Sequence, residues 1–204
     1  MRQSRHLDFH RTEVAVACTG AVILCGSWVL VTIDASVPGW EQSLFEGVNG
    51  LPDALWPVVW GPMQLGSFLG SLVVVGVTGA VTRDRRLTLA MLLASQAAFW
   101  SAKLVKASVS RERPAALLPD VHIRESADGF GYLSGHAAVA FSLAAALAPS
   151  LPRPWRPIPF VAAGLVAFGR VYAGAHLPLD VIGGAGLGIL AGLAARRVFG
   201  LRHT

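Results

Sequence analysis

The stretch GRVYAGAHLPLD, residues 169–180, stands between two long apolar runs at 157–169 and 181–195. Pro178 suits the first turn of a helix, because its missing N–H group needs no partner there. His176 and Asp180 are four residues apart, so we expect them on one face of that helix, one turn apart. A carboxylate so placed can hold an imidazole in one tautomer and stabilise its protonated form. A capped helix start with a buried acid fits the short pattern equally well.

The composition around this stretch is that of a membrane protein. Of the 204 residues, 53% are hydrophobic and 14% are charged, whereas soluble domains carry about 25% charged residues; the mean hydropathy is +0.55. The uncharged apolar runs are 14–33, 54–82, 87–102, 137–152, 157–169 and 181–195. The first two reach the ~20 residues that cross a bilayer as a helix, and the shorter ones can end in snorkelling basic side chains. We expect an all-α polytopic membrane protein with six transmembrane helices in a single domain, residues 1–204.

The basic residues predict the orientation in the membrane. The net charge is +5, but the basic residues are dispersed among apolar runs, so we expect no solvated basic face and no nucleic-acid partner. Eleven of the 17 Lys and Arg lie in residues 1–12, in 83–86, in 153–156 and in the carboxyl tail. The positive-inside rule then places both termini, including a tail at residues 1–12, in the cytoplasm of a cell that carries the protein in its plasma membrane. The other six are Lys103, Lys106, Arg111, Arg113, Arg124 and Arg170.

Two polar segments connect the expected spans. Residues 34–53 read as an amphipathic connection at the interface, with Trp40 in the aromatic belt. Residues 107–133 form the long extracytoplasmic segment, and such a segment is usually functional or disordered. We expect its charges Arg111, Glu112, His122 and Arg124 to be solvated, and Phe130 and Tyr132 to anchor at the interface.

Three groups of residues fall on the predicted extracytoplasmic side: Lys106 with Arg113-Pro114, the triplet Ser134-Gly135-His136, and Arg170 with His176 and Asp180. Two crossings separate the second group from the third. Three cations can surround a dianionic tetrahedral group, since the guanidinium fork matches phosphate oxygens in pairs. The helix that begins at Ser134 adds the backbone N–H donors of Ser134, Gly135 and His136.

The two histidines complete this chemistry. His176, oriented by Asp180, can attack phosphorus, while His136 can protonate the leaving oxygen and later activate water. These residues give every role that a covalent phosphohydrolase requires.

The three groups resemble the signature motifs of the type 2 phosphatidic acid phosphatases (PAP2), integral membrane lipid phosphatases that share a motif set with vanadium haloperoxidases. The resemblance implies a haloperoxidase-like helical core and a phosphohistidine intermediate on His176, with His136 as general acid. It implies phosphate contacts from the residues Lys106, Arg113, Ser134, Gly135 and Arg170, and no metal or other cofactor. The chain departs from the family at Leu133, where proline is usual, and at Gly169, where serine is usual.

The expected substrate is a lipid phosphate held by the bilayer: a phosphomonoester such as phosphatidylglycerophosphate or phosphatidate, or a polyprenyl diphosphate such as undecaprenyl diphosphate. The apolar residues do not separate these tails, and they leave the oligomeric state open. Three other readings stay open. They are a lipid phosphotransferase on the same site, a metal site made of His136, His176 and Asp180, and a transporter whose pathway the ionisable residues line.

Overall fold

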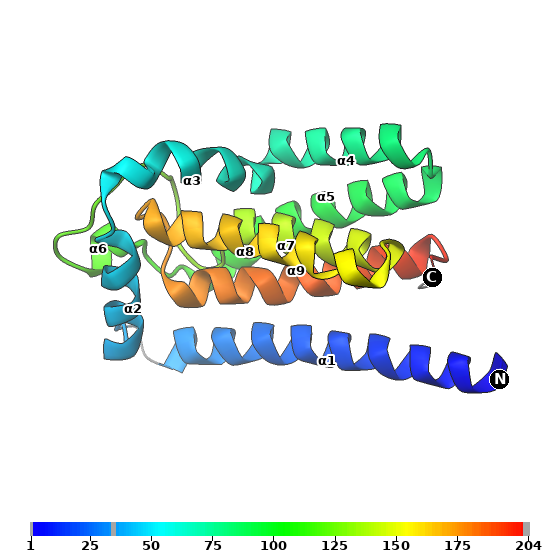
Figure 1. Cartoon of the computed structure of the whole chain (residues 1–204). Helices are drawn as coiled ribbons and strands as arrows, with labels where there is room; N and C mark the ends of the chain where they lie inside the picture. The colour runs from blue at the N-terminus through cyan, green and yellow to red at the C-terminus, as the bar shows by residue number, and fades with distance from the viewer. Residues whose placement is uncertain (1, 34–35, 202–204) are drawn as a thin grey trace.

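The computed structural model describes residues 2–33 and 36–201, with side chains from residue 13 onward. In this part of the chain every regular element is helical, as the composition predicts. The long helices lie side by side, and both chain ends lie at the same end of the bundle (Figure 1). The predictions of charge and topology also involve the side chains of residues 1–12, the segment 34–35 and Arg202, which lie outside the described part.

The helices follow the predicted runs closely at most boundaries. They are α1 (Arg2–Ile33), α2 (Gly39–Asn49), α3 (Trp56–Met63), α4 (Phe68–Thr82), α5 (Arg85–Val109), α6 (Pro114–Leu117), α7 (Gly135–Leu147), α8 (Pro157–Tyr172) and α9 (Pro178–Val198). Local chemistry sets their starts. The carboxylate of Asp84 accepts two N–H groups at the start of α5, and Pro178 occupies the first turn of α9 as predicted.

The number of spans is less clear-cut than the sequence suggests. Three segments are long and apolar enough to cross a membrane: Glu13–Ile33, Arg85–Leu117 and Pro178–Val198. α7 and α8 have only 13 and 16 residues, short of the ~20 that a full crossing needs. The structure therefore supports at least three spans, and the six-span plan stays a prediction.

The run 54–82, expected to hold one continuous span, is broken. Residues 53–66 and α4 form two helical pieces that meet at an angle of 74°. At the break Ser67 is extended, and its hydroxyl accepts the N–H of Gly70 at 3.0 Å. Gly66 has no room for a side chain, because a Cβ there would lie 2.5 Å from the carbonyl oxygen of His136. The break thus brings the backbone of this segment against the first turn of α7.

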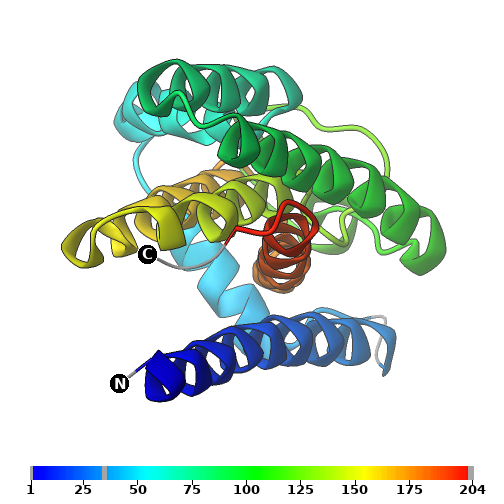
Figure 2. The same cartoon turned by 90° about the vertical axis from the view of Figure 1, so that its right-hand side faces the viewer.

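A glycine stripe brings α9 against α7. A Cβ on Gly184, Gly188 or Gly192 would lie 2.5, 2.3 or 2.6 Å from a backbone carbonyl oxygen of the segment Ser134–Ser142. The close approach that four-residue glycine spacing predicts therefore operates inside the bundle. α9 also packs against α1 and α5, and Figure 2 shows it at the centre of the molecule.

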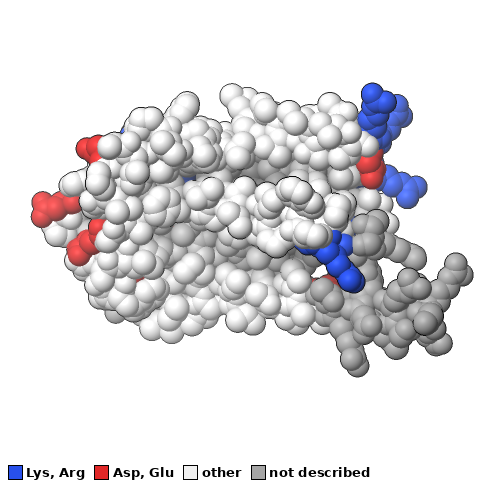
Figure 3. Space-filling model, in the orientation of Figure 1, with Lys and Arg blue, Asp and Glu red and all other residues white. Residues whose placement is uncertain are grey.

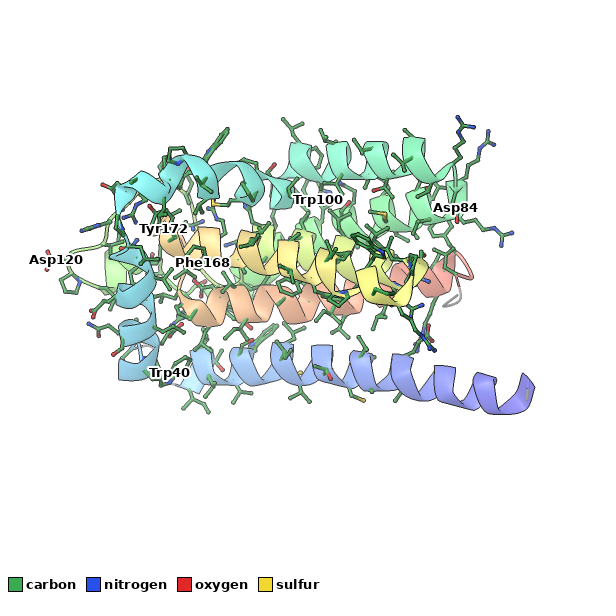
Figure 4. All side chains as sticks on the ribbon, viewed as in Figure 1. Trp40, Asp84, Trp100, Asp120, Phe168 and Tyr172 are labelled. Carbon is green, nitrogen blue, oxygen red and sulfur yellow. The ribbon has the colours of Figure 1, made fainter. Side chains whose placement is uncertain are left out.

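The two ends of the bundle differ in charge. Figure 4 marks one end by Asp84, in the turn between α4 and α5, and the other by Asp120, in the loop beside α2 and α6. Most of the Lys and Arg visible in Figure 3 gather at the Asp84 end, and the acidic residues gather mainly at the other. α2 lies across the Asp120 end (Figure 1).

Candidate active site

Four helix ends meet near the end of the bundle that α2 crosses. Lys106 lies in the last turn of α5 and Arg170 in the last turn of α8. His136 lies in the first turn of α7, and Asp180 in the first turn of α9. The structure therefore brings the three predicted groups of residues to one end of the molecule, although they are far apart in the sequence (Figure 1).

His176 lies just outside α9 rather than on it, which corrects the expectation of one shared helix face. Leu177 is the N-cap residue, and its N–H donates to Oδ2 of Asp180 at 2.9 Å. The turn that carries His176 is held by Arg170, whose carbonyl oxygen accepts the N–H groups of Ala175 and His176 at 3.1 and 3.2 Å. The histidine is thus positioned by the end of α8 and the start of α9 together.

The imidazole and the carboxylate are nevertheless close. Nδ1 of His176 lies 3.4 Å from Oδ2 of Asp180, although among the described residues it has no partner in hydrogen-bond geometry. The carbonyl of Gly131 also faces the ring. Because Nδ1 is turned toward these acceptors, Nε2 is the nitrogen left for a reaction.

The other oxygen of Asp180 binds a residue that the motifs do not include. Nη1 of Arg111 donates to Oδ1 of Asp180 at 3.0 Å, and Nη2 donates to Oε2 of Glu41 in α2 at 2.7 Å. Arg111 is 8% exposed, and both acids are fully buried. The expectation that Arg111 is a solvated loop charge is wrong, because two buried carboxylates compensate the cost of taking its guanidinium out of water.

Lys106 and Arg113 bind the backbone of the loop before α7. Nζ of Lys106 donates to the carbonyls of Phe130 and Gly131 at 2.7 and 3.0 Å. The guanidinium of Arg113 donates to the carbonyls of Asp128 and Gly129 at 2.6 and 2.7 Å, and to that of Ala175, beside His176, at 2.6 Å. Two predicted phosphate ligands thus also fold the loop around the site.

The third cation is paired with an acid that sequence reasoning missed. Nη1 of the buried Arg170 donates to a carboxylate oxygen of Glu125, which also accepts from the amide of Gln64 at 3.3 Å. Nε of Arg170 is buried and has no hydrogen-bond partner among the described residues. A buried donor without an acceptor is costly, so Arg170 is suited to an added anion.

The start of α7 supplies fewer donors than the sequence predicts. The N–H of Ser134 donates to the carbonyl of Asp180 at 2.9 Å, and the Ser134 hydroxyl caps the N–H of Ala137 at 3.5 Å. In the described part of the chain the N–H groups of Gly135 and His136 bind no protein acceptor. Two of the three expected backbone donors therefore remain for an anion at this helix end.

The cations act on both imidazoles. Lys106, Arg113 and Arg170 all lie within electrostatic range of His136 and His176, and the two histidines are within range of each other. His176, in the loop between α8 and α9, is fully buried. Burial first, and then Lys106, Arg170 and Arg113, hold the pKa of its imidazole well below the usual value of 6.5. His176 is therefore neutral at physiological pH, as a nucleophile must be.

Two further expectations for the loop are wrong. The side chain of Arg124 is 7% exposed and lies over the ring of Tyr172, with its Cζ 4.0 Å from the ring centroid. Tyr132 is fully buried, and its hydroxyl contacts that of Ser27 in α1 at 2.9 Å. Arg124 and Tyr132 therefore hold the loop in place. His122 and Glu112 are exposed, as predicted.

Gly169, one of the departures from the family pattern, packs closely against Met63. A Cβ there would lie 3.1 Å from two carbon atoms of Met63, which is fully buried. A serine at this position would therefore require the side chain of Met63 to shift by a few tenths of an ångström.

No group of three His, Cys, Asp or Glu side chains within residues 2–33 and 36–201 is arranged to hold a metal ion. Asp180 would be the carboxylate ligand if the site held a metal ion. Its two oxygens instead accept hydrogen bonds from Arg111 and from the N–H of Leu177. The geometry instead offers cations and N–H donors around two imidazoles, which suits a bound anion.

Fold and site together define a helical membrane protein with a cation-lined anion site at one end of its bundle. A family model described as the PAP2 superfamily matches residues 86–203. The chain belongs to this family of membrane lipid phosphatases, as the motifs predict.

Two solved structures are similar to the chain. LpxE of Aquifex aeolicus has 28% identity and a TM-score of 0.69, over 76% of this chain and 94% of that one. A transmembrane PAP2-type phosphatidylglycerolphosphate phosphatase of Bacillus subtilis has 24% identity and a TM-score of 0.68, over 91% of this chain and 94% of that one. A comparison with curated protein sequences gives no match.

Proposed function

We propose that the protein removes phosphate from a lipid phosphomonoester or a polyprenyl diphosphate, through a phosphohistidine intermediate on His176 and without a metal ion. One observation carries this proposal: three cations from two separate groups of the sequence lie within electrostatic range of two histidines at one end of the bundle. Candidate substrates are undecaprenyl diphosphate, phosphatidylglycerophosphate and phosphatidate.

The reaction has two balanced steps. Nε2 of His176 attacks phosphorus, and the bond from phosphorus to the leaving oxygen breaks; that oxygen is the ester oxygen of a phosphomonoester or the bridging oxygen of a diphosphate. His136, which takes up a proton when the phosphate dianion binds beside it, gives the leaving oxygen that proton. His136 then takes a proton from water, whose oxygen attacks phosphorus, and the phosphorus–nitrogen bond breaks to release inorganic phosphate. Lys106, Arg113 and Arg170 balance the charge on the phosphoryl oxygens throughout.

The orientation follows from charge. In this proposal six helical segments cross the bilayer, with the broken pair α3 and α4 counted as one. The Arg-rich turns at 83–86 and 153–156 and the end of α9 face the cytoplasm, so the site opens on the extracytoplasmic side. The concentration of Lys and Arg at the end opposite the site supports this orientation (Figure 3).

An apolar cavity of about 210 Å³ gives the lipid tail a place. Its lining is Leu65, Val74, Met91, Ala140, Leu143, Ala144, Leu147, Ile158, Pro159, Ala162, Ala163 and Val166. Ala140 follows His136 by one turn of α7, and Val166 precedes Arg170 by one turn of α8. From there the lining continues to Leu147 at the end of α7, about 10 Å further at ~1.5 Å per residue. We assign this cavity to one hydrocarbon chain of the substrate.

In this proposal the cavity orients the lipid tail and contributes little to the affinity for the lipid. A lipid tail is surrounded by apolar groups inside the cavity and outside it, so transfer between the two gains little free energy. Alignment of the tail along α7 and α8 directs the phosphate toward Arg170 and His176, and such positioning accelerates a reaction strongly.

The test is phosphate release by the purified protein in liposomes. The panel holds the three candidate lipids and a short-chain analogue of the best one. His176→Ala and His136→Ala should lose about 10³-fold or more in turnover, and Asp180→Asn should lose less. Vanadate should inhibit. Ala163→Leu should slow the long-chain lipid and spare the short-chain analogue. Val161→Leu, on the same helix with Val161 61% exposed, is the matched control.

Each competing reading has its own outcome. Transfer of the phosphoryl group to an alcohol without free phosphate would indicate the phosphotransferase. Loss of activity to a chelator and recovery with metal would indicate the metal site. Flux across the liposome without phosphate release would indicate a transporter. Wild-type turnover in either histidine variant contradicts the proposal.

A further inference from the structure

Glu41 is a fully buried acid on a helix that crosses one end of the bundle. It lies outside the PAP2 motifs and outside the residues 86–203 that match the family model. We propose that Glu41 is a positioning residue, which compensates the positive charge of Arg111 so that the buried group of Glu41, Arg111 and Asp180 presents a net negative charge to His176. The inference rests on the proposed phosphohistidine chemistry and adds α2 to the active site.

Every oxygen of the Glu41 carboxylate is used. Oε2 accepts from Nη2 of Arg111 at 2.7 Å, and Oε1 accepts from its Nη1 at 3.2 Å. Oε1 also accepts the backbone N–H of Leu179 at 2.8 Å. Leu179 is the neighbour of Asp180 in the first turn of α9. Glu41 therefore holds both the cation that binds Asp180 and the backbone that carries it.

The arrangement is more than a structural ion pair. One guanidinium serves two buried carboxylates, since Nη1 of Arg111 also donates to Oδ1 of Asp180 at 3.0 Å. With ordinary ionisation the three side chains carry a net charge of −1. Burial of three charges opposes folding, and well-packed apolar side chains are often no less stable. A benefit for the reaction accounts for their presence better than stability does.

The net charge supplies that benefit. Without Glu41 the positive charge of Arg111 would cancel the field of Asp180 at the imidazole. With Glu41, one negative charge remains beside Nδ1 of His176, 3.4 Å from Oδ2. The imidazole becomes positively charged when Nε2 is phosphorylated. A fixed negative charge at Nδ1 stabilises that intermediate and the transition state that leads to it.

The experiment compares four variants of the full-length protein in liposomes, on the lipid phosphate that the wild type hydrolyses best. Glu41→Gln should lower kcat about 10- to 100-fold and leave KM within about threefold, because Glu41 does not face the phosphate cations. Glu41→Asp should recover part of the loss. Glu46→Gln, on the exposed side of the same helix, should match the wild type.

The decisive variant is Glu41→Gln combined with Arg111→Gln. It removes one negative and one positive charge, so Asp180 again leaves a net charge of −1. The double variant should be faster than Glu41→Gln alone, and rapid-quench trapping should show that its phosphoenzyme forms faster. A merely structural role predicts the reverse, since a second buried bond is lost.

Two results would overturn the inference: wild-type kcat in Glu41→Gln, or a double variant no faster than Glu41→Gln. If Glu41→Gln fails to fold, the double variant is compared with Glu41→Asp instead, because the double variant holds no uncompensated buried guanidinium. A double variant without measurable turnover would then overturn the inference equally. Failure of the proposed function has a different signature, because the wild type would then release no phosphate from any lipid of the panel.

Discussion

The contact between α7 and α9 offers a sharp test of how the site is assembled. A Cβ on Gly188 would lie 2.3 Å from the carbonyl oxygen of Ala138, and real contacts of this kind essentially never fall under 3.0 Å. Gly188→Ala must therefore move the two helices apart by about 0.7 Å, since backbone on both sides leaves no flexible atom to yield. α7 carries His136 and α9 carries Asp180, so the two halves of the proposed site separate by a similar amount.

A misplacement of about 1 Å costs a reaction on the order of 10²-fold, so we expect Gly188→Ala to lower kcat about 10- to 100-fold. The helix preference of alanine offsets part of the packing cost, so the free energy of unfolding should fall by only about 1–2 kcal/mol. Phosphate release and thermal unfolding in the same detergent measure the two effects.

Gly164→Ala is the matched control for this prediction. Gly164 lies within α8, and a Cβ there meets no atom within 4 Å. We expect this variant to keep wild-type turnover and to gain about 0.5–1 kcal/mol in stability. Wild-type turnover in Gly188→Ala would refute the claim that this backbone contact sets the geometry of the site.

Two further predictions concern the charges of the site. Glu125→Gln removes the carboxylate that competes with substrate for Arg170, so KM for the lipid phosphate and the inhibition constant of vanadate should each fall about three- to tenfold; unchanged constants in steady-state assays would show that the pair does not compete. The pKa of His176 is lowered in the folded protein, so the unfolded chain binds its proton first as the pH falls. The stability that His176 contributes is complete above about pH 6.5 and declines below it, by at most about 1.4 kcal/mol per pH unit. Thermal unfolding from pH 8 to pH 5 should therefore show a flatter decline for His176→Asn than for the wild type, and parallel curves would contradict the assignment.

The sequence predicts that the site residues share one side of the membrane, because apolar runs and glycine spacings recur along it in regular patterns. The apolar runs fix which helix ends share one side, and the glycines of α9 recur every four residues, which places them all on one face. A face without side chains allows the backbones of α7 and α9 to touch. The sequence therefore predicts that the three groups share one side of the membrane, whereas the contact of α7 with α9 is seen only in the structure.

Whether the charged residues of the loop 107–133 are solvated or buried could not be predicted from such patterns. Whether Arg111 is solvated depends on Glu41, which is 70 positions away in the sequence, and the two carry no shared local pattern. Arg124 is similar, because its guanidinium binds the carbonyls of Asn49, Leu51 and Tyr172. Burial of a cation is set by partners that only the fold brings together.

Two features of the sequence do indicate the buried acid and the broken span. Glu41, Phe45 and Asn49 are the buried residues of α2, and their four-residue spacing marks one face of a helix. An acid on the same face as a buried phenylalanine indicates a buried partner. The broken span is similar, since Pro62 and Gly66 inside an apolar run are typical of a helix that ends or bends.

The proposed reaction must bind a phosphate dianion and must stabilise a positively charged phosphohistidine, and two different groups of charged residues serve these two purposes. Lys106, Arg113 and Arg170 carry three positive charges, and Glu125 reduces them to a net +2, which matches a phosphomonoester dianion. The group of Glu41, Arg111 and Asp180 carries a net −1, with Oδ2 of Asp180 3.4 Å from Nδ1 of His176, which matches a phosphorylated imidazolium. If Arg111 instead belonged to the phosphate cations, the anion would be held more tightly but the intermediate would lose its counter-charge. Because only charge that develops in the transition state accelerates the reaction, the burial of Arg111 between two carboxylates favours turnover over binding.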